Sequence, residues 1–229
     1  MDRYSEVTNK NQREIVLLKG FSCVWGKCSF CDYTLDNDDN EDEMNEINFK
    51  TLDNVTGKYK VLEVINSGSC FELPKKTLEK IKSIIEEKNI EKLFLESHWS
   101  YKNRLNEMRE FFNIPIVFKI GVESFDYDFR NNFLNKNAKF KSVEELKKYF
   151  DSPCIMVGIK GQSKEMIDKD MDIVLNNFEH ATINVFVNNT TNIKRDEELV
   201  NWFKEKYSFL DENSKIEVLY NNTDFGVGE

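Results

Sequence analysis

Three cysteines lie close together near the start of the sequence, in residues 23–31, which read CVWGKCSFC. Their spacing, C-x4-C-x2-C, lets three thiolates face one metal centre, and soft sulfur ligands select zinc, copper(I) or iron–sulfur clusters. A structural zinc site usually takes four protein ligands, but the other two cysteines, Cys70 and Cys154, lie far along the chain. Three cysteine anchors on a four-iron cluster leave one iron open to a small molecule. We therefore predict a [4Fe–4S] cluster, with a zinc knuckle as the alternative. The predicted ligands are Cys23, Cys28 and Cys31.

The composition limits the kind of protein that this chain can be. It has 229 residues, 40% of them hydrophobic, which predicts one globular domain with a sizeable core. The apolar runs are too short to span a membrane, and the polar N-terminal segment lacks the apolar core of a signal peptide. Five cysteines with three in one motif are typical of a cytoplasmic metal-binding protein rather than a disulfide-bonded one.

The net charge of the chain is −9. Affinity for nucleic acids rests mostly on Lys and Arg side chains that neutralise phosphates. A broad surface for intact nucleic acid is therefore not expected, and a small-molecule substrate agrees better with the charge.

Short apolar runs alternate with amphipathic stretches along most of the chain. Strands are expected at residues 14–20, 60–66, 92–96, 115–122, 154–159, 181–187 and 215–219. Helices are expected at residues 73–89, 100–112, 143–150, 164–178 and 195–207, with a short helix or loop at 125–134. This alternation predicts right-handed βαβ units and a parallel sheet, with too few units for a closed eight-fold barrel. The acidic segment 36–46 is expected to be a loop, either solvated or acting as a lid over a ligand.

Polar residues follow the predicted strands at their carboxyl ends, where ligands bind in sheets of this kind. Ser67-Gly68-Ser69 follows the second strand. Its glycine allows close backbone approach, and its hydroxyls offer hydrogen bonds. Glu96 ends the third strand, where a carboxylate can accept two hydrogen bonds from a ribose diol. His98 follows as a catalytic or substrate-binding candidate, although a lone histidine is more often structural.

The fourth predicted strand carries a polar face where a core face is expected. Lys119, Gly121 and Glu123 alternate along it, so their side chains lie on one side. Such polarity indicates a binding site. After the sixth strand, Asn188 and Asn189 offer amides and hydrogen-bond acceptors to a heterocycle edge or a sugar.

Taken in order, these segments resemble the radical S-adenosylmethionine (radical SAM) superfamily over residues 14–190. The usual cysteine spacing in that family is C-x3-C-x2-C, with an aromatic residue before the last cysteine. Here Phe30 matches, and the first gap is one residue longer. The resemblance implies a partial (β/α)6 barrel in a single domain over residues 1–229, with a C-terminal helix and strand in residues 195–220. It also implies that the open iron of a [4Fe–4S] cluster chelates the amino and carboxylate groups of S-adenosylmethionine.

Other segments match the family with departures. Residues 67–69 replace its commoner Gly-Gly-Glu, and Val157 replaces the first glycine of its adenine-binding Gly-x-Ile-x-Gly pattern. Lys119 stands where the family has a basic residue that pairs with the cofactor carboxylate, although Lys offers only a point charge where Arg would form a bidentate pair. The residues that the resemblance assigns to the cofactor are Phe30, Ser67, Gly68, Ser69, Glu96, Lys119, Glu123, Ile159 and Gly161.

Among small members of this family, the chain looks most like the bacterial queuosine lyases, which release queuine from queuosine or its 5′-phosphate. The alternatives are a 7-deazaguanine-forming synthase, a glycyl-radical activase and a non-catalytic iron–sulfur electron-transfer protein. The resemblance implies a nucleoside or nucleotide substrate and an electron donor such as flavodoxin or ferredoxin. The predicted catalytic residues are His98 and Lys160. The predicted substrate contacts are Glu43, Glu46, His98, Arg130, Asn188 and Asn189, with Lys160 or Arg130 holding a phosphate.

Overall fold

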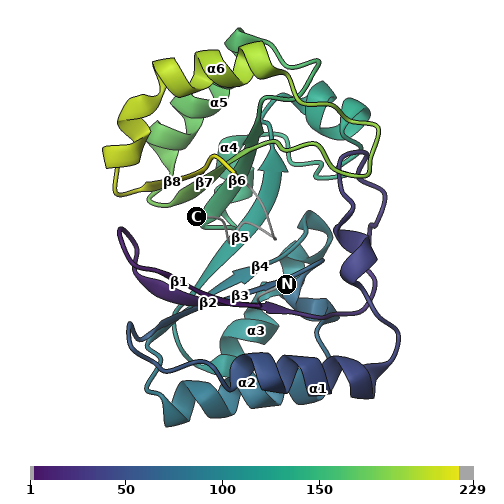
Figure 1. The fold of residues 1–229 in the computed structure, drawn as a ribbon, viewed down its shortest axis with the longest axis vertical. Helices are drawn as coiled ribbons and strands as arrows, with labels where there is room; N and C mark the ends of the chain where they lie inside the picture. Colours follow the sequence, from purple (N-terminus) through teal and green to yellow (C-terminus); the bar gives the residue numbers. More distant parts are fainter. Residues whose placement is uncertain (1–2, 222–229) are drawn as a thin grey trace. The chain divides into compact units, whose positions relative to one another are not determined.

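The computed structural model describes residues 3–221 (Figure 1). These residues form two compact units. The first comprises residues 3–26 and 33–118, and the second comprises residues 27–32 and 119–221. The cysteine segment, residues 23–31, is therefore divided between the two units.

The first unit contains a mainly parallel sheet. Its strands are β1 (Tyr4–Val7), β2 (Arg13–Leu18), β3 (Val61–Asn66) and β4 (Lys92–Glu96), in that order, and β5 (Ile116–Glu123) begins in this unit. β1 is antiparallel to β2, whereas β2, β3 and β4 are parallel. Every residue of β2 is buried, as expected for a parallel strand that is covered on both faces.

Helices and short helical turns connect these strands. The helices are α1 (Glu41–Leu52), α2 (Lys75–Glu87) and α3 (Leu105–Phe112), and the 3-10 turns are η1 (Tyr33–Asp36), η2 (Cys70–Glu72) and η3 (Trp99–Arg104). α1 and α2 lie side by side (Figure 1). α2 follows Pro74 and buries Ile81, Ile84 and Ile85, the spacing of one helical face.

The second unit contains the rest of β5, followed by β6 (Ser152–Val157), β7 (Ala181–Val185) and β8 (Ile216–Leu219), all parallel and in chain order. Its helices are α4 (Val143–Lys147), α5 (Lys164–Asn177) and α6 (Glu197–Lys206), with a π-helical turn, η4 (Phe129–Phe133), and a 3-10 turn, η5 (Ser208–Glu212). Both α5 and α6 contact β6. The register pairs Cys154 with Thr182 and Met156 with Asn184, so these four side chains share one face of the sheet.

The predicted strands and helices are confirmed, with ends that differ by a few residues. Two elements differ from expectation. β1 was not predicted, and the acidic segment 36–46 is only partly a loop, because α1 begins at Glu41. Asn40 caps that helix by accepting a hydrogen bond from the Glu43 N–H at 3.3 Å. Acidic residues fill the first turn, where the helix dipole favours negative charge.

None of the helices within residues 3–221 has the length and apolar character needed to cross a bilayer.

Candidate active site

The cysteines fall into two groups by exposure. Cys23 in the first unit, and Cys28 and Cys31 in the second, are partly exposed and not in disulfide bonds, whereas Cys70 and Cys154 are buried. Burial, followed by the charge of Glu72, raises the pKa of the Cys70 thiol far above its ordinary value. A cysteine binds a metal as its thiolate, and a raised pKa keeps Cys70 in the thiol form. Cys70 is therefore poorly suited to metal binding. Within residues 3–221, no three His, Cys, Asp or Glu side chains form a group that could hold a metal ion. The assignment of three cysteines to a cluster therefore stays a prediction.

In the first unit, Glu72 holds the start of the cysteine segment. Its buried carboxylate accepts hydrogen bonds from the Val24 N–H at 2.8 Å and the Tyr101 hydroxyl at 3.2 Å, and it also accepts from the Ser69 N–H. Burial raises the pKa of Glu72. Sequence reasoning missed this residue, although its place just after the polar turn that follows β3 was a signal.

The predicted turn Ser67-Gly68-Ser69 lies against the first cysteine. A Cβ atom at Gly68 would lie 3.4 Å from the Cys23 Cα and would also clash with the Glu72 carboxylate. A side chain at position 68 would therefore displace the Glu72 carboxylate that holds the Val24 N–H. The Ser69 hydroxyl accepts a hydrogen bond from the His98 N–H at 2.9 Å, so two of the predicted strand-end segments contact each other.

The His98 ring has a structural task. Its Nδ1 caps η3 by accepting a hydrogen bond from the Ser100 N–H at 3.2 Å, and it lies 2.9 Å from the Ser100 hydroxyl. His98 thus has a structural role, and its predicted catalytic role stays a prediction. Glu96 ends β4 and is partly exposed, where its predicted contact with a ribose diol stays a prediction.

In the second unit, Phe30 anchors the rest of the cysteine segment. It belongs to a buried apolar cluster, and Cys28 and Cys31 pack against this cluster. The other members of the cluster are Phe129, Leu134, Met156, Ile159 and Phe186. The Phe30 carbonyl accepts a hydrogen bond from Asn189 Nδ2 at 2.7 Å. The predicted residue Phe30 thus sets the position of both neighbouring cysteines.

The two asparagines after β7 make hydrogen bonds that hold loops together. Asn189 Nδ2 bonds to Phe30 and, at 3.1 Å, to Asp32, while its Oδ1 accepts from the Thr191 N–H and hydroxyl. Asn188 is exposed, and its Oδ1 accepts from the Arg195 N–H at 2.9 Å. Their predicted contact with a substrate stays a prediction.

Arg130 is also corrected. It is 1% exposed, and its guanidinium donates to the carbonyls of Ser124, Ala138 and Phe140 at 2.8, 2.8 and 3.2 Å. The group lies 3.8 Å from the centre of the Phe140 ring. A guanidinium enclosed in this way braces the backbone and is not placed to hold a phosphate.

The predicted polar face of β5 is present, with an unexpected partner. Lys119 and Glu123 are both buried, and the register between β5 and β6 shifts between Gly121 and Glu123. Glu123 Oε1 accepts a hydrogen bond from Lys136 Nζ at 2.7 Å. Sequence reasoning missed Lys136 because it lies in a loop with no pattern of its own.

The segment after β6, which the resemblance assigns to the adenine of the cofactor, forms a turn. The assignment to adenine stays a prediction. Gly161 has a φ of 104°, which favours glycine, and Ile159 is fully buried. Gln162 shapes this turn, since its Oε1 accepts from the Ile159 N–H at 2.9 Å and its Nε2 donates to the Met156 carbonyl at 2.8 Å. Lys160 is exposed.

Glu43 and Glu46 lie exposed on α1. The predicted loop is therefore corrected from residue 41 onward, because these carboxylates belong to a regular helix. Their predicted contact with a substrate stays a prediction.

Two residues that sequence reasoning missed are Thr182 and Asn184 on β7. Thr182 Oγ1 and Asn184 Oδ1 are buried with no hydrogen-bond partner among residues 3–221. Their register partners are Cys154 and Met156, and Met156 packs with Phe30. Unpaired buried polar atoms on the face that meets the cysteine segment are suited to a ligand. The only available signal was polar residues at alternate positions of an otherwise apolar strand.

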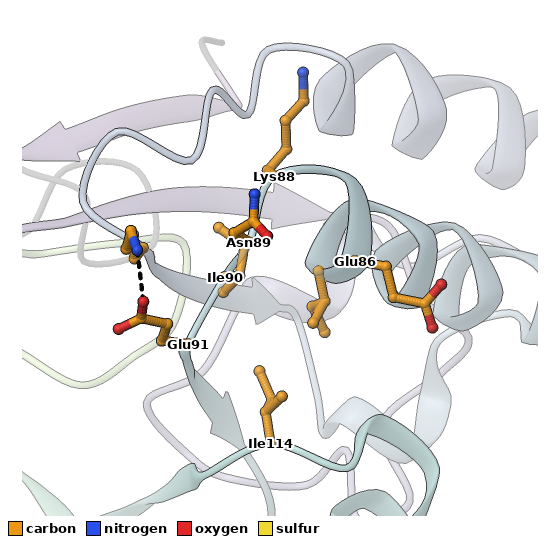
Figure 2. A pocket seen from close by; sticks show the side chains of 8 residues that line it. Glu86, Lys88, Asn89, Ile90, Glu91 and Ile114 are labelled. Atoms are coloured by element: carbon orange, nitrogen blue, oxygen red, sulfur yellow. Dashed lines mark hydrogen bonds and ion pairs between the residues drawn. The ribbon is translucent and has the colours of Figure 1, made fainter.

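A separate cavity of about 480 Å³ lies in the first unit, beside the residues that precede β3 and β4 (Figure 2). Lys60 and Glu91 line it and form an ion pair at 2.6 Å. It contains none of the predicted site residues, which follow these strands at their other ends.

No protein-family model matches the sequence. The chain is 54% identical to a solved structure, the queuine lyase from Clostridium spiroforme bound to SAM and queuine, with a TM-score of 0.97 and 100% of each chain covered. It is also 25% identical over 156 residues to an uncharacterized protein of Methanocaldococcus jannaschii, which covers 58% of this chain and 42% of that relative. The chain thus spans less than half the length of this curated relative. The agreement with the solved structure confirms the predicted fold class, a partial (β/α)6 barrel.

Proposed function

The chain belongs to the radical SAM queuine lyases, and on this premise we propose that it cleaves S-adenosylmethionine reductively and releases queuine from queuosine or queuosine 5′-phosphate. The observation that carries the proposal is the 54% identity over the whole chain to a queuine lyase whose structure holds SAM and queuine. Relatives this similar over their full length share a fold, and the proposal extends this likeness to the reaction.

The residues present suit a [4Fe–4S] cluster held by Cys23, Cys28 and Cys31. All three are partly exposed and none is in a disulfide bond. Gly68 leaves room for the Glu72 carboxylate, which holds the Val24 N–H beside Cys23. The bound cluster and S-adenosylmethionine would supply the radical chemistry. The protein's part is to hold the reacting groups in position and keep water away.

Positioning of the cysteine segment is the clearest task of the surrounding side chains. Glu72 holds the Val24 N–H next to the first cysteine, and Asn189 holds the Phe30 carbonyl next to the last. Each of these partners is itself fixed by further hydrogen bonds. Such support orients ligands that would otherwise move with a flexible loop.

For S-adenosylmethionine, we carry forward Ser67, Gly68, Ser69, Glu96, Lys119, Glu123, Ile159 and Gly161 as proposed contacts. Lys119 supports this assignment because it is 4% exposed. A buried lysine needs partners that compensate its charge, and a cofactor carboxylate would join those that Lys119 already has.

For the substrate, β7 offers the contacts that the geometry supports best. Leaving Thr182 Oγ1 and Asn184 Oδ1 unpaired costs about 1–3 kcal/mol for each buried group. A modified nucleoside carries N–H and O–H groups that would satisfy both atoms. Exposed Lys160 is kept as a proposed phosphate contact.

The wider setting is proposed on the same basis. We expect a flavodoxin or ferredoxin as electron donor, a cytoplasmic location, and one functional domain over residues 1–229 with its core in residues 14–190. Cysteines outside disulfide bonds support a reducing compartment.

The test is an anaerobic reaction of the reconstituted protein with S-adenosylmethionine, a reductant and queuosine 5′-phosphate, followed by mass spectrometry. We expect free queuine and 5′-deoxyadenosine in equal amounts. A matched reaction with the Cys23→Ala variant should yield neither product.

Other outcomes separate the alternatives. 5′-Deoxyadenosine without queuine would retain radical chemistry but reject this substrate, and would direct attention to a 7-deazaguanine-forming or glycyl-radical-activating role. A cluster that is reduced without any 5′-deoxyadenosine would indicate an electron-transfer protein. Bound zinc without iron would reject the cluster itself.

A further inference from the structure

The loop that follows η4 holds one side of the cysteine segment. The Leu134 carbonyl accepts a hydrogen bond from the Ser29 N–H at 2.9 Å. The next side chain, Asn135, donates from Nδ2 to the Lys27 carbonyl at 2.7 Å. Lys136 comes directly afterwards, so its side chain starts from a backbone that is tied to this segment.

The Lys136 ammonium group lies near both Glu123 and Phe30. Its Nζ is 2.7 Å from Glu123 Oε1 and 5.5 Å from the centre of the Phe30 ring, and the side chain is 15% exposed. The charges of Glu123, Cys28 and Cys31 all act on this ammonium group. A lysine side chain therefore lies close to two of the predicted cluster ligands.

The backbone of β5 is shaped for this pair. Glu123 has a φ of 64°, in the left-handed region that non-glycine residues rarely adopt, and a bulge separates it from Gly121. A Cβ atom at Gly121 would clash with both Glu123 Oε1 and Lys136 Nζ. Backbone strain of this kind is found where function requires a particular side-chain direction.

We propose that Lys136 raises the reduction potential of the [4Fe–4S] cluster, and that Glu123 limits the size of this effect. The inference rests on the proposed function only for the presence of the cluster. Reduction adds one electron from a flavodoxin or ferredoxin, which is oxidised by one electron, and no bond or proton changes. The added electron makes the net charge of the cluster and its three thiolate ligands more negative by one unit.

A fixed cation stabilises the more negative, reduced form, and the net charge around a cluster is a main determinant of its potential. Glu123 opposes this effect because its negative charge partly compensates Lys136. Lys136 thus shifts the reduction potential to a more positive value and Glu123 shifts it to a more negative value. Single and double substitutions can test these opposite effects.

The experiment measures the midpoint potential of the reconstituted cluster without S-adenosylmethionine, by following the electron paramagnetic resonance signal of the reduced form during a mediated titration. Lys136→Met should shift the midpoint to a more negative value, and Glu123→Gln should shift it to a more positive value. The double variant should lie between the two, and Lys136→Arg should stay close to the wild type. Lys139→Met removes an exposed lysine three positions away and should change nothing.

Unchanged midpoints in Lys136→Met and Glu123→Gln at wild-type iron content would overturn the proposal, as would shifts of both in the same direction. If Lys136→Met binds no iron, the positive shift in Glu123→Gln still decides the question. Queuine release by the wild type is assayed in parallel. Absence of queuine with the expected shifts rejects the proposed substrate alone, whereas a wild type that binds no cluster rejects both proposals.

Discussion

The Glu72 carboxylate accepts a hydrogen bond from the backbone N–H of Val24 at 2.8 Å. A side chain from the turn after β3 thereby fixes the residue next to Cys23, although 48 positions separate the two residues in sequence. The Glu72 carboxylate is buried, and it also accepts hydrogen bonds from the Tyr101 hydroxyl and the Ser69 N–H. A buried carboxylate with several donors is more strongly ordered than one with a single partner.

Glu72→Ala should release the Val24 N–H and destabilise the protein by about 1.5–3 kcal/mol, the usual contribution of a hydrogen bond to a charged group. The measurement is urea denaturation together with iron content after reconstitution. Tyr101→Phe is the matched control, since it removes one donor to Glu72 and leaves Val24 held. Equal iron binding in Glu72→Ala and the wild type would contradict a role in positioning Cys23.

Alanine at each predicted cluster ligand should abolish iron binding, whereas alanine at the buried cysteines should not. Cys23→Ala, Cys28→Ala and Cys31→Ala each leave two thiolates, too few to retain the cluster. Cys70→Ala and Cys154→Ala serve as controls because both side chains are buried. Iron analysis and visible absorption measure the cluster content. A full cluster in any of the first three variants would contradict the assignment of that cysteine as a ligand.

Lys119→Ala should weaken S-adenosylmethionine binding by about 1.5–3 kcal/mol, because a charged hydrogen bond to the cofactor carboxylate would be lost. Isothermal calorimetry of the reconstituted protein measures this directly. Exposed Lys92, at the start of β4, provides the control substitution Lys92→Ala. An unchanged affinity in Lys119→Ala would count against the contact.

Thr182→Val and Asn184→Leu should each raise KM for queuosine 5′-phosphate roughly fivefold, which corresponds to about 1 kcal/mol for one lost hydrogen bond. Uncoupled cleavage of S-adenosylmethionine should change little, because the proposed substrate contact is not a cofactor contact. Steady-state kinetics and 5′-deoxyadenosine formation without substrate distinguish these effects. A matching loss in both assays would point to a structural role for β7 instead.

Stability should depend on pH through Asp170. This residue of α5 accepts a hydrogen bond from the Phe125 N–H at 2.7 Å, and burial raises its pKa from 3.8 to about 7. The folded state then binds more protons than the unfolded state between about pH 4 and pH 7, so the free energy of unfolding should fall as pH rises through this window. Denaturation at several pH values measures the slope.

Asp170→Asn is the control for this pH dependence. The amide oxygen can still accept the hydrogen bond from Phe125, but the side chain no longer titrates. The fall in stability between about pH 4 and pH 7 should therefore become shallower in the variant. The same slope in both proteins would show that other groups cause it.

Local patterns in the sequence were enough for much of the fold. β4 has the predicted bounds, because a short apolar run between polar residues identifies a buried strand without knowledge of its neighbours. α1 could also have been predicted from Asn40 followed by Glu43, the spacing of a helix cap, but the many acidic residues suggested a loop. The cysteine spacing likewise needed no tertiary information.

Only the tertiary structure decided which polar side chains remain available to a ligand. Arg130 and Asn189 were predicted to meet the substrate, yet backbone groups of other segments accept hydrogen bonds from their side chains. Lys136 and Glu72 were not predicted, yet each lies beside the cysteine segment. The sequence by itself determined the cysteine trio and the strands, since both depend on residues close together in the chain. Hydrogen-bond partners depend on contacts between distant residues, such as Asn189 with Phe30, 159 positions apart, and these form only when the strands and loops are assembled.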